Sequence, residues 1–231
     1  MSEYLRGLQT HIGLKFLVAL TGAMLVIFVT GHMLGNLQIY LGPEAVNSYA
    51  ATLKSMPGLL WAARLGLLAA LVIHVWGITT LTLDNRQARP VAYAEKHSRQ
   101  ASFASRTMAL SGLVLLAFVV YHLMHLTLGI IHPEYYGLRD MQGRHDVYSM
   151  TVLGFREPAI ALSYIAAMGL LGMHLVHGVA SAFQSMGWNR PKLFPLVGVF
   201  GRALALVIVI GNISIPLSCW LGVIKPMQGV L

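Results

Sequence analysis

The sequence is built from long runs of apolar residues separated by shorter polar stretches. A helix needs about 20 mostly apolar residues to cross the hydrocarbon core of a bilayer, which is roughly 30 Å thick. Five runs are long enough, and none carries an Asp or Glu in its deep part. We therefore predict an all-α integral membrane bundle that forms a single domain over residues 1–231. Its five transmembrane helices are expected at about 14–40, 59–83, 105–131, 158–183 and 196–222.

Proline and glycine mark the boundary between the first two predicted spans. Gly42-Pro43 follows the first span and Met56-Pro57-Gly58 opens the second, and both combinations interrupt helices. The segment Pro133–Glu157, between the third and fourth spans, is longer and mixed in charge, and we expect it to hold a short interfacial helix.

The composition agrees with a membrane protein and excludes other classes. Only 10% of the residues are Asp, Glu, Lys or Arg, whereas soluble domains carry about 25%. With 56% hydrophobic residues and a mean hydropathy of +0.67, the chain is neither a soluble globule nor a disordered segment. The net charge of +8 then indicates membrane lipid, and not nucleic acid, as the partner. The single Cys219 excludes an internal disulfide and any multi-cysteine iron–sulfur or zinc site.

Basic residues are distributed unequally between the two sides of the predicted bundle. Counted over loops and span ends, ten lie on the side of the N-terminus and six on the other. The positive-inside rule therefore places the N-terminus in the cytoplasm, and we expect a multi-pass protein of the inner (cytoplasmic) cell membrane. The cytoplasmic side is called the inner side below. Its basic surface either follows from topology alone or is a docking face for a soluble partner.

Six of the ten histidines lie within the predicted spans. An ionisable side chain inside a membrane is costly and marks a functional site by default. A single one is often only a hydrogen-bonding group between helices, but here four consecutive helices each contribute at least one. They are His32 in the first span, His74 in the second, His122 and His125 in the third, and His174 and His177 in the fourth.

Depth along the helices sorts these histidines into two layers. At about 1.5 Å per residue, His32 and His122 lie about 25 Å from the inner boundary, in the outer half of the membrane. His74 and His174 lie about 22 to 24 Å from the outer boundary, in the inner half. We refer to His32 and His122 as the outer pair, and to His74 and His174 as the inner pair.

Two histidines from facing helices at one depth are what bis-histidine ligation of a haem requires. Each neutral imidazole presents one ring nitrogen to the iron, and the other nitrogen donates a hydrogen bond to a neighbouring group. Zinc or copper is the rival metal, but zinc prefers three or four ligands together. Small residues near the histidines would leave room for a porphyrin, although they are also common in ordinary helix packing in lipid. These are Gly31, Gly35, Gly77, Gly172 and Gly178.

Two of the histidines have a close competitor. His125 follows His122 by three residues and His177 follows His174 by three, so each couple lies roughly on one helix face. Only one member of each couple is needed to bind iron, and the other is free to bond a propionate, a quinone or another helix. The residues themselves leave both choices open.

Short motifs in three spans resemble the cytochrome b membrane-anchor subunit of succinate:quinone oxidoreductases, the family of succinate dehydrogenase and fumarate reductase. The similarity is greatest to the single-subunit, five-helix, di-haem type and covers nearly the whole chain in helix number and histidine placement. In the first span it rests on Thr21-Gly22 and on the run from Gly31-His32 to Asn36. In the third it rests on Gly112 followed by His122, and in the fourth on Met173-His174-Leu175-Val176-His177-Gly178 and the following Ser181-Ala182-Phe183-Gln184.

The resemblance implies two haem b groups, each held by one axial histidine from each of two helices. His74 and His174 would bind the iron of the inner haem, and His32 and His122 that of the outer haem. The spacing in the family favours His122 over His125 and His174 over His177. The resemblance also implies a flavoprotein subunit and an iron–sulfur subunit on the cytoplasmic face, with electrons passing through this chain to menaquinone or ubiquinone. No succinate oxidation is expected from this chain alone.

Two other functions stay open from the residues. One is the anchor cytochrome b of another quinone-linked dehydrogenase, and the other is a transporter whose histidines bind a metal ion or relay protons. The quinone site is not assigned. Its candidates by polarity are Asn36, Gln38, Tyr40 and Arg64 towards the outer side, and Arg106, Ser181 and Gln184 towards the inner side.

Overall fold

The computed structural model describes residues 10–88, 103–188 and 190–227, and in these ranges every named element is helical. Five helices there are long and apolar enough to cross a membrane, which confirms the predicted all-α membrane bundle. Two of them continue into a short helix of different pitch, η1 and η2. The spans are α2 (His11–Asn36) with η1 (Leu37–Leu41), α4 (Pro57–Gln87), α5 (Phe103–His122) with η2 (Leu123–Thr127), α8 (Pro158–Ser185) and α9 (Phe194–Trp220).

Local sequence explains where the spans begin. Thr10 caps α2, because its hydroxyl oxygen accepts a hydrogen bond from the Gly13 N–H at 3.1 Å. The helices α4, α8 and α9 each carry a proline in the first turn, where its missing N–H is not needed. Gly42, at φ 98°, turns the chain after η1 in a conformation that favours glycine. At the other end of α2, its first residue His11 lies 3.5 Å from Asp84, near the end of α4.

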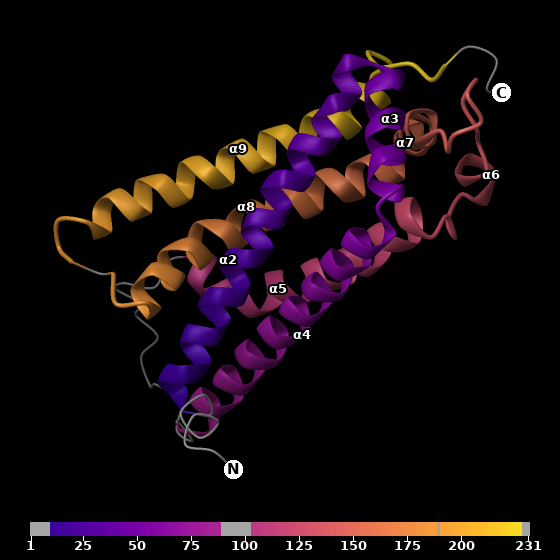
Figure 1. Cartoon of the computed structure of the whole chain (residues 1–231). Coiled ribbons are helices and arrows are strands. Elements are labelled where there is room, and N and C mark those ends of the chain that lie inside the picture. The colour runs from indigo at the N-terminus through magenta and orange to yellow at the C-terminus, as the bar shows by residue number, and fades with distance from the viewer. Residues whose placement is uncertain (1–9, 89–102, 189, 228–231) are drawn as a thin grey trace.

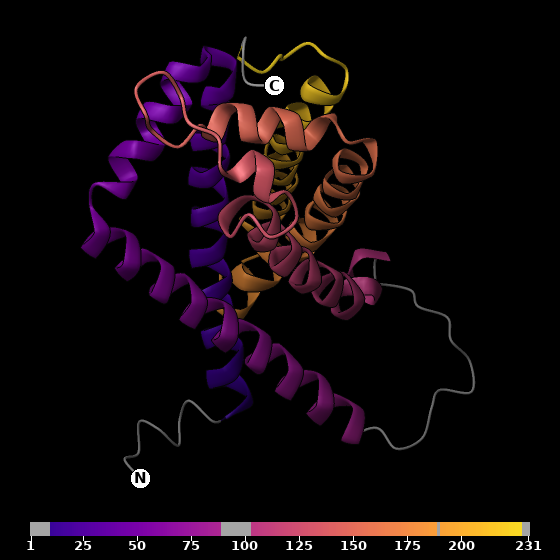
Figure 2. The ribbon, with the colours of Figure 1, turned by 90° about the vertical axis from the view of Figure 1, so that its right-hand side faces the viewer.

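The bundle is assembled around α8, against which α9, α5 and α2 pack (Figure 1). The helix α4 packs along α2 and also contacts the short helix α3 (Pro43–Lys54), which precedes it in the chain. Between α4 and α5 the described residues make no extensive contact, and Figure 2 shows these two helices standing apart. The histidine-bearing helices therefore form two units, α2 with α4 and α5 with α8, joined where α2 packs on α8.

Three short helices cover the end of the bundle at which α2 finishes, and we call them the outer cap (Figure 1). The interfacial helix expected in Pro133–Glu157 is present as α7 (Val147–Arg156), preceded by the single turn α6 (Pro133–Tyr136). The third, α3 (Pro43–Lys54), was not predicted, because Gly42-Pro43 suggests a loop. Pro43 instead occupies the first turn of α3, so the same two residues end one helix and begin the next.

Buried polar side chains hold the outer cap together. Asn47 of α3 is 1% exposed, donates to the Asp146 carboxylate at 3.0 Å and accepts from the Tyr148 N–H at 3.0 Å. Asp146 also caps α7 by accepting from the Ser149 N–H at 3.0 Å. Because an unpartnered buried polar group costs about 1–3 kcal/mol, these bonds fix α3 and α7 relative to each other.

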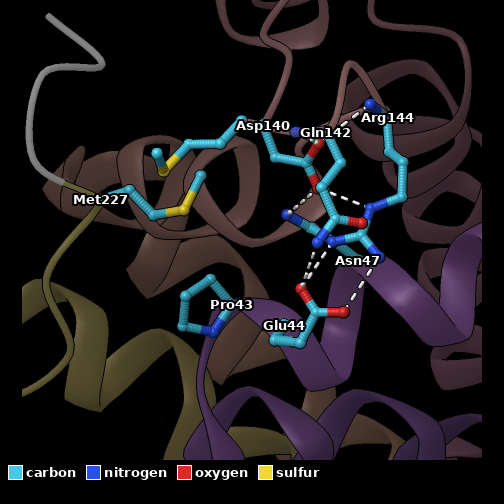
Figure 3. A pocket seen from close by; sticks show the side chains of 8 residues that line it. Pro43, Glu44, Asn47, Asp140, Gln142, Arg144 and Met227 are labelled. Atoms are coloured by element: carbon cyan, nitrogen blue, oxygen red, sulfur yellow. Dashed lines mark hydrogen bonds and ion pairs between the residues drawn. The ribbon is translucent and has the colours of Figure 1, made fainter.

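At the rim of the cap, Arg144 bridges two carboxylates (Figure 3). Its guanidinium lies 2.7 Å from Glu44 Oε2 and 2.7 Å from Asp140 Oδ2. The hydrogen bond from Arg144 lowers the pKa of Glu44. Burial by itself raises the pKa of Asp140, but the bonds from Arg144 and two backbone N–H groups outweigh burial and lower it. These residues and Met227 line a small pocket, and the charges of its rim are paired with one another.

His145 lies in the cap among cationic neighbours. Its ring contacts that of Tyr136, with centroids 4.8 Å apart. Burial, followed by the charges of Lys54 and Arg139, lowers the pKa of His145 from 6.5 to about 4, while Asp146 opposes this shift. The cap therefore holds His145 neutral at neutral pH.

We predict that protonation of His145 weakens the cap in mild acid. The unfolded chain binds this proton near pH 6.5 and the folded chain only near pH 4. Between these values the unfolded chain binds more protons, so stability is lost as the pH falls through this window. The unfolding temperature of the purified protein should drop less between about pH 7 and about pH 4.5 in His145→Gln than in the wild type. Parallel pH profiles of the two proteins would contradict the prediction.

Candidate functional site

The outer pair meets between α2 and α5. The ring centres of His32 and His122 lie 5.8 Å apart, and their planes are nearly perpendicular, at 89°. Two imidazoles that bind one metal ion from opposite sides, through bonds of about 2 Å, have ring centres about 6 Å apart. The observed spacing therefore suits a single metal centre between the two rings. His32 also stacks on Phe28, one turn earlier on α2, at 5.3 Å.

His74 of the inner pair leans from α4 onto α2. Its Nδ1 lies 3.1 Å from the Val18 carbonyl oxygen and 3.2 Å from the Thr21 hydroxyl. A carbonyl oxygen only accepts, so Nδ1 of His74 carries the proton and donates. The unprotonated nitrogen is then Nε2, on the other side of the ring.

His174, the second member of the inner pair, is held in the same way by α5. Its Nδ1 lies 3.2 Å from the Ser111 hydroxyl, and that hydroxyl donates its own proton to the Met108 carbonyl at 3.0 Å. The Ser111 oxygen must therefore accept from Nδ1 of His174, which again leaves Nε2 unprotonated. His74 and His174 come from α4 and α8, which are not packed together extensively within the described residues.

The two inner histidines rest on matching dipeptides, which we call the hydroxyl–glycine pairs. These are Thr21-Gly22 on α2 and Ser111-Gly112 on α5. A Cβ atom at Gly22 would lie 3.1 Å from Cε1 of His74, and one at Gly112 would lie 3.5 Å from Cε1 of His174. Glycine thus lets each ring approach the neighbouring helix closely.

The hydroxyl–glycine pairs also set the distance between the two layers. In both α2 and α5, the histidine of the outer pair follows the glycine by ten residues. At about 1.5 Å per residue, this separates the layers by about 15 Å along the helices. Thr21-Gly22 and Gly112 already belong to the motif resemblance, but the role of the Thr21 and Ser111 hydroxyls as partners of the inner histidines is visible only from the contacts.

The two histidines of the third span, His122 and His125, have different neighbours. Over η2 the helix widens to a π-type turn, a feature often found at functional sites. His125 is 3% exposed and lies against Gly154 of α7, whereas His122 is half-buried and faces His32. Both rings reach the hydroxyl of Tyr164, which lies 3.3 Å from Nδ1 of His122 and 2.9 Å from Nδ1 of His125. Of the two, His122 is the one placed to share a ligand with His32.

The competitor on α8, His177, is half-buried and makes no hydrogen bond with another described residue. Within that part of the chain it has no anchoring partner comparable to the Ser111 hydroxyl that bonds His174. Within the described residues, no three His, Cys, Asp or Glu side chains converge to hold a metal ion. His32 and His122 therefore meet as a pair, an arrangement suited to an ion that takes its other ligands from a bound group.

The glycines expected to leave room for a porphyrin divide into two groups. A Cβ atom at Gly35, Gly77 or Gly172 would meet Tyr49, Val18 or Val209 within 3.0 Å, which is ordinary close helix packing. Nothing lies within 4 Å of a Cβ atom built at Gly31 or Gly178. Only this second group leaves open space beside His32 and near His174.

Among the residues considered for a quinone, Tyr40 bonds Ser218 of α9 at 3.0 Å and Arg64 lies over the Trp61 ring at 5.2 Å. These contacts are structural, and they single out no quinone site. The side chain of Arg106 and most of the loop Asp84–Ser105, expected on the inner face, lie outside the described residues.

Comparison with known proteins finds no matching family model, no matching curated protein and no matching solved structure.

Proposed function

We propose that the chain is the di-haem b membrane anchor of a succinate:quinone oxidoreductase, as the motif resemblance implies. The observation that carries the haem assignment is the contact of His32 with His122, whose ring centres lie 5.8 Å apart between α2 and α5. Both inner histidines have Nδ1 engaged by a neighbouring helix, so that Nε2 is the nitrogen available to iron. This is the hydrogen-bond pattern found around metal-bound imidazoles.

Each pair would hold one haem. His74 and His174 would ligate the inner haem, and His32 and His122 the outer haem. Bound in this way, haem b supplies a one-electron carrier with no open coordination position. Thr21, Ser111 and Tyr164 would orient the imidazole rings. The surrounding helices and lipid would keep water away from them. The separation of about 15 Å between the layers suits electron transfer in two steps across the membrane.

The inner end of the bundle would receive the soluble subunits. Exposed cationic side chains lie on the described segments there, at the beginning of α2, the end of α4, the α8–α9 connection and the first half of α9. With the N-terminus in the cytoplasm, this surface would dock an iron–sulfur subunit that carries electrons from a succinate-oxidising flavoprotein, and a membrane quinone would accept them. The described cations are Lys15, Arg86, Arg190, Lys192 and Arg202.

The choice of ligands is tested by replacing single histidines with phenylalanine, which keeps a ring but offers no nitrogen. Variants of His32, His74, His122 or His174 should each fall from two haem b groups per chain to about one, because each loses one axial ligand. The matched changes at His125 and His177 should keep both. Haem is measured by the pyridine haemochrome spectrum of the purified protein. A loss of haem in His125→Phe or His177→Phe, with retention in the neighbouring variant, would reverse the assignment.

The succinate assignment is tested separately by gentle purification from native membranes. A flavoprotein and an iron–sulfur protein should co-purify, and the complex should reduce a quinone with succinate, whereas the isolated chain should not. A di-haem chain that co-purifies with a different dehydrogenase would retain the haem assignment and overturn the succinate assignment.

A further inference from the structure

Tyr164 contacts a second histidine besides the His122 ring that it would orient. It lies on α8, 6% exposed, among the rings of Phe118 and Phe155, whose centroids are 4.9 Å and 4.8 Å away. Its hydroxyl has two polar neighbours, Nδ1 of His122 and Nδ1 of His125. A buried phenol in an aromatic environment thus bridges the two histidines of α5.

Hydrogen-bond counting gives this bridge a direction. A phenol has one proton to donate, and a neutral imidazole has one N–H. If His122 presents Nε2 to iron, its Nδ1 carries the proton and donates to the Tyr164 oxygen. The Tyr164 hydroxyl then donates to Nδ1 of His125, which accepts. The result is a chain of two hydrogen bonds that point away from the metal and polarise each other.

The far end of this chain is held by the outer cap. Nε2 of His125 faces Gly154 of α7, where a Cβ atom would lie only 2.6 Å away. The ring also contacts Phe155, with centroids 6.0 Å apart. The inner layer has no such extension, because Ser111 passes its proton directly to a backbone carbonyl of its own helix. The two layers therefore differ in what lies behind their axial histidines.

We propose that Tyr164 and His125 are positioning residues that act through His122 and lower the redox potential of the outer haem relative to a site without them. The inference rests on the proposed haem ligation. Hydrogen bonding at the distal nitrogen makes a ligating imidazole more electron-rich. An electron-rich ligand stabilises ferric over ferrous iron, so the chain from His122 to His125 favours the oxidised outer haem.

The decisive variant is Tyr164→Phe, studied in the purified full chain by a redox titration that resolves the two haems. The midpoint potential of the outer haem should rise, while that of the inner haem should stay unchanged. Tyr121→Phe is the matched control, since Tyr121 lies beside Tyr164 and His125 at 5.9 and 6.1 Å between ring centroids but bonds neither. It should leave both potentials unchanged. Wild-type potentials for both haems in Tyr164→Phe would overturn the proposal.

A second variant keeps the test valid if Tyr164→Phe does not fold with both haems. His125→Phe removes the acceptor at the end of the chain and leaves Tyr164 in place, so it should raise the outer potential in the same direction and by less. An unchanged outer potential in His125→Phe would also overturn the inference. Failure of the proposed function has a different signature, because the wild-type chain would then contain no pair of b haems to titrate.

Discussion

The hydrogen bond between Nδ1 of a membrane histidine and a group on the neighbouring helix is the constraint on which the rest of the structure depends. It lowers the free-energy cost of burying a polar ring in an apolar bundle, and it fixes which ring nitrogen carries the proton. His74 obtains it from α2 and His174 from α5, in each case next to a glycine that lets the ring come close. The helices must therefore pack as two units, α2 with α4 and α5 with α8.

The two units explain the layered arrangement. In each unit, the helix with the hydroxyl–glycine pair also carries the outer histidine ten residues later. Packing the units through α2 and α8 brings His32 next to His122 without extensive contact between α4 and α5. The outer cap closes one end of this arrangement through Gly154 and His125.

Much of this architecture could be predicted from the sequence because it depends on length and depth. The span from Pro158 was placed by its apolar run, and the association of His32 with His122 by counting residues from the membrane boundary. What could not be predicted depends on register between helices. Gly77 and Gly172 were expected beside a porphyrin, but their neighbours are Val18 and Val209, because helix rotation decides which face a glycine presents.

The hydrogen-bond partners were missed for the same reason. Ser111 carries no local signal that it meets His174, which is 63 residues away in the chain. In the sequence, nothing distinguishes Tyr164 from an ordinary aromatic residue of a membrane helix. Only the structure places its hydroxyl between two histidines. The helix α3 was missed for a local reason, since Pro43 both follows a helix end and begins the next helix.

We propose above that paired histidines hold two haems without an open iron position. The most direct test is the low-temperature electron paramagnetic resonance spectrum of the oxidised, purified chain. We expect two low-spin ferric signals, of which the outer one is strongly anisotropic because the planes of His32 and His122 are nearly perpendicular, at 89°. A spectrum without haem signals, or one dominated by high-spin iron, would contradict it.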